Sequence, residues 1–116
     1  MWLYTKSGFY SVVHKPPCKR GELMVRARNA DDINELQAIL EKEFHFTGKV
    51  IETTKADYAY RMLVPRQTWA EFMARLAMTL DYDNFKDTIP RADRLRHDAY
   101  YRCWEAMWDW QNSGKI

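Results

Sequence analysis

Short pairs of strand-like segments constrain what this chain can fold into more than any other feature. Residues 1–5 and 9–14 are rich in aromatic and β-branched side chains, and the connection between them ends in Gly8. Residues 49–54 and 58–64 form a second pair with an equally short connection. Strand-like segments that are so closely spaced predict β-hairpins. We therefore expect an antiparallel sheet.

A third strand pattern lies at residues 22–28. Its side chains alternate, so that Leu23, Val25 and Ala27 fall on one face and Met24, Arg26 and Arg28 fall on the other. An alternation of period two is typical of a strand with one buried face. Pro16 and Pro17 end the strand before it, because proline cannot donate a hydrogen bond to a sheet.

Apolar residues at helical spacing predict helices at residues 30–43, 66–80 and 91–110. Asn29 is a suitable N-cap for the first of them, and the aspartates that follow lie in the first turn, where the helix dipole favours anions. Leu80 is expected to be the last core residue of the second helix.

The resulting order of elements is β-β-β-α-β-β-α-α. It indicates an α+β fold in which an antiparallel sheet of about five strands carries helices mainly on one face. The central β-α-β-β-α segment gives this fold a ferredoxin-like, split βαβ character. A chain of 116 residues is expected to form a single domain over residues 1–116.

The second half of the last predicted helix is apolar on two sides. A helix of this kind is either sandwiched between other elements or carries an exposed patch for a partner. Aromatic residues are common at protein interfaces. We therefore take one of its two stripes as the candidate partner-binding surface, namely Tyr101, Trp104 and Trp108.

Two clusters combine carboxylates, phenols and basic groups, at residues 57–61 and 81–86. The candidate site residues in them are Asp57, Tyr58, Tyr60, Arg61, Asp81, Asp83 and Asn84. Arg61 shares one face of its predicted strand with Ala59 and Leu63. An arginine on such a core-like face requires a carboxylate partner, so we expect Asp81 or Asp83 to pair with it. A structural tie, a ligand site and a small metal-assisted hydrolase built on the three aspartates remain alternatives.

Charge is unevenly distributed along the chain, although the net charge is only +2. Residues 14–28 are rich in basic side chains and residues 29–43 in carboxylates. Two solvated faces of neighbouring elements explain such blocks most simply. Cations near exposed rings can also bind nucleic acid. A nucleic-acid or nucleotide site in this basic hairpin region would use Lys15, Lys19, Arg20, Arg26 and Arg28.

The motifs of common catalytic and cofactor-binding sites are absent from the sequence. There is no phosphate-binding glycine loop, HExxH or GxSxG. His14 and Cys18 are spaced for one metal ion, but no second ligand pair follows, so we expect no metal and no cofactor. Cys18 and Cys103 lie far apart, and no apolar run approaches the roughly 20 residues of a membrane span. We expect a cytoplasmic protein with two free thiols and no membrane contact.

Four short motifs are the most distinctive pieces of the sequence. Residues 2–5 and 8–13 read WLYT and GFYSVV, and residues 56–61 and 81–86 read ADYAYR and DYDNFK. Together with residues 22–28, which read ELMVRAR, and the VP pair before the second helix, they resemble a family of uncharacterised short bacterial and phage proteins. Members of that family share an N-terminal "MW…T…GF(F/Y)SVV" hairpin. The resemblance implies no catalytic residue, and it implies an accessory protein of a mobile element that acts against a host defence.

The expected function is that of a small, non-enzymatic module that binds a protein partner or a second copy of itself. For a phage product, the partner would be a host defence complex. Surplus aromatic residues without a catalytic motif lead to this expectation. The alternatives are a nucleic-acid or nucleotide binding protein and a small metal-assisted hydrolase.

Overall fold

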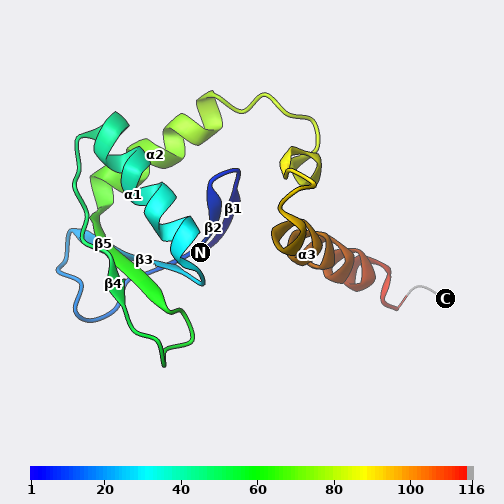
Figure 1. Ribbon diagram of the computed structural model, residues 1–116, viewed down its shortest axis with the longest axis horizontal. Coiled ribbons are helices and arrows are strands. Elements are labelled where there is room, and N and C mark those ends of the chain that lie inside the picture. Colours follow the sequence, from blue (N-terminus) through cyan, green and yellow to red (C-terminus); the bar gives the residue numbers. More distant parts are fainter. Residues whose placement is uncertain (115–116) are drawn as a thin grey trace. The chain divides into compact units, whose positions relative to one another are not determined.

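The computed structural model describes residues 1–114 and divides the chain into two compact units, with the boundary between Leu80 and Asp81 (Figure 1). The first unit contains the whole sheet and two helices, and the second contains a short 3-10 helix and one long helix. Each unit is described by itself.

An antiparallel sheet of five strands forms the first unit, and its spatial order is β1-β2-β3-β5-β4. For four of the five strands, both ends lie within two residues of the predicted ends. Strand β4 is shorter than expected, because only two of its residues pair with β5. The strands are β1 (Trp2–Thr5), β2 (Gly8–Val13), β3 (Glu22–Ala27), β4 (Ile51–Glu52) and β5 (Tyr60–Pro65).

Two helices, α1 (Ala30–Phe44) and α2 (Arg66–Met78), lie on the same face of this sheet (Figure 1). Their apolar stripes and one face of the central strands form a single buried core. It contains Tyr10, Val12, Val25, Ala27, Ile33, Leu36, Leu40, Met62, Val64, Trp69 and Phe72. The predicted α+β class, the antiparallel sheet and the helices on one face are confirmed.

The ferredoxin-like character comes from the path through β3, α1 and β4. Both strands pair antiparallel with β5, so they run parallel to each other with β5 inserted between them. This is the split βαβ arrangement that the order of elements predicted. As a result, β3 and β5 become neighbours although a helix and a strand separate them in sequence.

Buried polar bonds join the first hairpin to the start of α1. Asn29 caps the helix by accepting a hydrogen bond from the Asp32 amide (2.9 Å). The Asp32 carboxylate accepts one from the Phe9 amide (3.0 Å), and the Tyr10 hydroxyl donates to the Asp32 carbonyl (3.0 Å). Gly8 is required in the turn because a Cβ there would collide with the Asp32 side chain.

The end of α2 differs from the prediction. The helix ends at Met78, and the Thr79 hydroxyl donates to the Arg75 carbonyl (2.7 Å) in place of a further helical turn. Leu80 is 56% exposed, so the expectation that it closes the core was wrong. The helix is shorter because its last core contacts are made one turn earlier, at Leu76.

The second unit contains the 3-10 helix η1 (Phe85–Thr88), which was not predicted, and α3 (Arg94–Asn112). The Asp93 carboxylate caps α3 by accepting bonds from the Arg96 amide (3.4 Å) and Arg96 Nε (2.9 Å). The rings of Phe85 and Tyr100 stack at 5.9 Å and join η1 to α3. Within the described residues, no helix is both long and apolar enough to cross a membrane.

Candidate functional site

Two arginines face each other across the two most extensively paired strands of the sheet. Arg26 of β3 is directly opposite Arg61 of β5, and Ser11 of β2 lies opposite Arg26 on its other side. Side chains that are paired in this way point to the same face of a sheet. That face lies opposite the helix-covered one, because Arg61 alternates with the core residue Met62. The expectation that Arg61 lies on a core-like face was therefore wrong.

Both guanidinium groups are only partly satisfied. Arg26 donates one hydrogen bond to the Ser11 hydroxyl (2.7 Å). In the described part of the chain, the Nε atoms of Arg26 and Arg61 are buried and have no hydrogen-bond partner. Within the first unit, neither group forms a described ion pair with a carboxylate. A buried donor without a partner is costly, so each such atom requires an explanation.

The turn before β5 completes this group. The Tyr58 ring is buried, with the Arg26 guanidinium carbon 4.5 Å and the Arg28 guanidinium carbon 4.2 Å from its centroid. The Asp57 carboxylate lies 3.2 Å from the Arg28 guanidinium. We define the arginine–tyrosine cluster as Ser11, Arg26, Arg28, Asp57, Tyr58 and Arg61. It unites residues that the sequence suggested as two separate groups, one polar and one basic.

The cluster carries three cations and one carboxylate. Contact with the Tyr58 ring restrains the guanidinium groups of Arg26 and Arg28 and leaves their N–H edges available to other groups. A planar guanidinium matches the paired oxygens of a phosphate or carboxylate group. The arrangement is therefore suited to hold an anion.

The rest of the predicted basic patch lies elsewhere. Lys15, Lys19 and Arg20 are exposed in the connection between β2 and β3. The Arg20 carbonyl accepts a hydrogen bond from Arg66 Nε (3.2 Å) at this end of the unit. Four residues of extended strand, about 13 Å, separate the start of β3 from Arg26. The structure thus divides the predicted patch into two parts.

The remaining polar candidates are not part of the arginine–tyrosine cluster as we define it. The Tyr60 ring packs against the core, and its hydroxyl approaches the Glu52 carboxylate at 3.4 Å. Asn84 begins η1, but its side chain makes no capping bond. Asp81 and Asp83 belong to the second unit, so their pairing with Arg61 stays a prediction.

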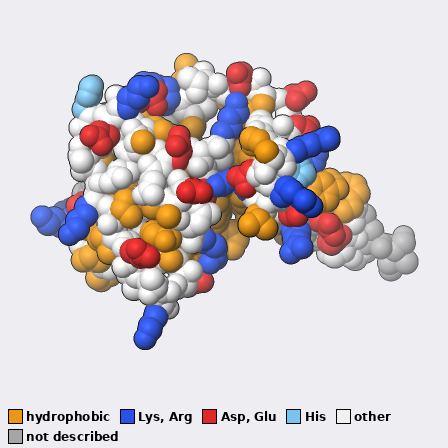
Figure 2. Space-filling model, in the orientation of Figure 1, with side chains coloured by type: hydrophobic (Ala, Val, Ile, Leu, Met, Phe, Trp, Pro, Cys, Tyr) orange, Lys and Arg blue, Asp and Glu red, His pale blue; other side chains and the backbone are white. Residues whose placement is uncertain are grey.

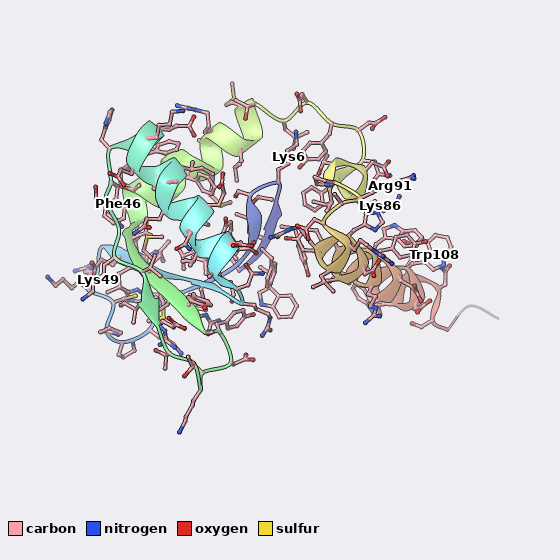
Figure 3. The ribbon with its side chains drawn as sticks, viewed as in Figure 1. Lys6, Phe46, Lys49, Lys86, Arg91 and Trp108 are labelled. Carbon is pink, nitrogen blue, oxygen red and sulfur yellow. The ribbon has the colours of Figure 1, made fainter. Side chains whose placement is uncertain are left out.

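The predicted partner-binding residues form a continuous surface on α3. Tyr101 and Trp104 have ring centroids 5.4 Å apart, and Trp104 and Trp108 stack at 5.9 Å with an angle of 15°. The three residues are 45%, 44% and 51% exposed. Lys86 of η1 lies 5.6 Å from the centroid of the Trp104 ring, and Figure 3 labels Lys86 together with Trp108 of α3. We call Tyr101, Trp104 and Trp108 the tryptophan ridge.

A metal site has little support from this arrangement. Among residues 1–114, no group of three or more His, Cys, Asp or Glu side chains could hold a metal ion. Asp57, the one aspartate of the proposed hydrolase within the first unit, is 81% exposed at its side chain and is paired with Arg28.

Sequence reasoning missed three residues on the cluster's face of the sheet. Ser11 was regarded only as part of a strand, although a hydroxyl in an otherwise apolar strand is a signal for a polar partner. Trp2 lies opposite Ser11, and its ring contacts that of Phe9 at 6.3 Å. Neither ring was considered as a binding residue.

Three segments that carry the resemblance converge on the arginine–tyrosine cluster. Residues 8–13 contribute Ser11, residues 22–28 contribute two arginines, and residues 56–61 contribute the other three members. The cluster is thus built from three separate segments of the first unit. Comparisons of the chain with known protein families, with curated proteins and with solved structures give no match.

Proposed function

We propose that this protein is a small, non-enzymatic binding module and that the arginine–tyrosine cluster holds a phosphate group of its ligand. One observation carries the proposal. Arg26 and Arg61 are direct cross-strand neighbours, and neither has a described carboxylate partner within the first unit. A phosphate supplies acceptors for several guanidinium donors at once.

The repulsion between the two arginines supports this proposal. Like charges directly opposite each other in a sheet are destabilising, on the order of 0.2–1 kcal/mol. A scaffold has no use for such a pair, since one arginine and one neutral residue would serve the fold better. An anion between the two guanidinium groups converts the repulsion into attraction.

The neighbours of the two arginines support the same reading. The Ser11 hydroxyl and the Tyr58 ring position Arg26 before any ligand arrives. Preorganised side chains lose less conformational entropy on binding. Arg28 adds a third cation at the edge, and its bond to exposed Asp57 is of the surface kind that contributes little stability.

A titration with inorganic pyrophosphate tests the proposal. Amide resonances of the ¹⁵N-labelled protein are followed at constant ionic strength, with sodium chloride as the reference titration. We expect saturable shifts at Ser11, Arg26 and Arg61 with pyrophosphate alone. The variants Arg26→Gln and Arg61→Gln should lose them.

The matched controls are Lys15→Gln and Lys19→Gln, which remove exposed cations outside the cluster and should keep the wild-type response. Shifts that are equal for chloride and pyrophosphate, or that survive both arginine substitutions, contradict the proposal.

The tryptophan ridge supports a second candidate function, the binding of a second copy of this chain or of another protein. Rings that are half-exposed over about two turns of a helix are typical of an interface. Figure 2 shows hydrophobic side chains gathered on this helix beside basic ones. A host defence complex, which the resemblance implies, is a proposed partner for the same ridge.

Charge along α3 favours a second copy in antiparallel orientation. Its first half contains three arginines against one aspartate, and its second half contains Glu105 and Asp109 and no basic residue. Two antiparallel copies bring unlike halves together, and unlike charges across an interface set orientation.

Sedimentation velocity tests this second candidate. The wild type is expected to dimerise, and the double variant Trp104→Ala, Trp108→Ala should be monomeric with unchanged far-ultraviolet circular dichroism. Loss of the helical signal would instead identify the two rings as packing residues. A monomeric wild type at all concentrations contradicts self-association.

A further inference from the structure

We infer that the ligand of the arginine–tyrosine cluster is single-stranded nucleic acid, with a backbone phosphate on Arg26 and Arg61 and a base stacked on Trp2. This inference rests on the proposed function, because it assigns a ligand class to the same cluster. It adds residues of β1 and β2 that the anion site alone does not use.

The first argument is the register of the sheet. Trp2, Ser11, Arg26 and Arg61 pair successively across β1, β2, β3 and β5, so they form one row on one face. Adjacent strands are about 4.8 Å apart, which places Trp2 about 10 Å from Arg26 and about 14 Å from Arg61. A ring and two cations thus lie along a straight line across the sheet.

The second argument is the state of the Trp2 ring. It is 70% exposed, which is unusual for the largest apolar side chain in a strand. Its one described ring contact is edge-on with Phe9, at an interplanar angle of 75°. Phe9 in turn lies 4.6 Å from the Tyr4 ring. The partly buried neighbours hold Trp2 in place and leave a face available.

The third argument is the chemistry that joins these parts. Proteins bind single strands by combining cations that follow the phosphates with aromatic rings that stack on the bases. A duplex hides the faces of its bases, whereas an unpaired strand exposes them. An exposed ring in line with two arginines fits an unpaired strand better than a duplex.

The exposed end of the row, at Trp2, argues for a polymer over a free nucleotide. Small molecules are usually bound in concave sites that enclose most of their surface. Trp2 and Arg28 are exposed on the sheet, so a mononucleotide would keep much of its surface in water. A strand compensates by making several such contacts along its length.

Fluorescence anisotropy of the whole chain tests this assignment. The probe is a labelled oligothymidylate of about 12 nucleotides, within the range that a sheet-based module covers. A blunt duplex of equal charge and unlabelled ATP are the competitors. We expect the single strand to bind best, and its affinity to fall between about 50 and about 200 mM NaCl.

Trp2→Ala should weaken binding of the oligothymidylate by about 5- to 150-fold, the contribution of one stacked base. The matched control is Trp110→Ala, because Trp110 is 71% exposed against 70% for Trp2 and lies on α3. The control should leave the affinity unchanged. Replacing Arg26 and Arg61 by Gln should reduce the salt slope by about 0.7, which corresponds to the one phosphate that the two arginines share on a single strand.

The outcomes separate this inference from the proposed function. If pyrophosphate binds but the oligothymidylate binds no better than ATP or the duplex, the cluster is an anion site and the single-strand assignment is wrong. Equal losses for Trp2→Ala and Trp110→Ala also overturn the assignment. If neither probe binds, both proposals fail. Unchanged circular dichroism of Trp2→Ala is required, and Trp2→Phe, which keeps a ring, should restore most of the affinity.

Discussion

The two units of this chain differ in where their stability comes from. In the first, side chains from two helices and three strands meet in a buried core. In the described part of the second, Ile89 is the only buried residue, and α3 buries none of its side chains. An isolated helix is marginal in water unless its apolar face is covered. The first unit is thus stabilised by tertiary packing. The second unit depends on local hydrogen bonds and ring contacts, and on any partner that covers the aromatic rings of α3.

The sharpest test of this contrast compares the same substitution in both units. Leu36→Ala, at a fully buried position of α1, should lower the free energy of unfolding by about 2–5 kcal/mol. Leu95→Ala, at a position of α3 that is 87% exposed, should change it by less than about 0.5 kcal/mol. Urea unfolding followed by circular dichroism measures both. Similar losses in the two variants would contradict the contrast.

A second test addresses the polar bonds within the first unit. Asp32→Ala removes the acceptor of the Phe9 amide and should destabilise the first unit by about 1–3 kcal/mol, because a buried donor loses its partner. Its neighbour Asp31 is exposed, so Asp31→Ala is the matched control and should cost far less. Thermal unfolding distinguishes them, and equal shifts of the melting temperature would show that the buried bonds are unimportant.

A third test addresses the local bonds of the second unit. Asp93→Ala removes the N-cap of α3 and should cost about 0.5–2 kcal/mol of helix stability. Because no core couples this helix to a sheet within its own unit, hydrogen exchange should become faster in α3 alone. Faster exchange throughout residues 1–80 would mean that the two units unfold as one.

Local patterns predicted the elements of the fold well. The alternation in β3 separated the core residues Val25 and Ala27 from Arg26, and Asn29 was recognised as the cap of α1. These features depend on residues that are close in sequence. The order of elements also gave the split βαβ arrangement.

The contacts of the candidate site could not be predicted from the sequence as well as the fold could. The proximity of Arg26 to Arg61 depends on the register between β3 and β5, which are separated by a helix and by β4. Tyr58 was expected to share a face with Tyr60, but the turn before β5 directs its ring toward the arginines. Sequence spacing does not encode either contact. The tryptophan ridge was found from the sequence, since its members are three and four residues apart on one helix.

The most direct test of the account is the stability of Arg61→Gln with and without pyrophosphate. Without ligand, the variant should be as stable as the wild type or more stable by up to about 1 kcal/mol, because it removes a like-charged neighbour. Pyrophosphate at about ten times its Kd should stabilise the wild type by about 1.4 kcal/mol and leave the variant unchanged. A variant that is clearly less stable without ligand, together with no effect of pyrophosphate on the wild type, would make Arg61 part of the scaffold and contradict the account.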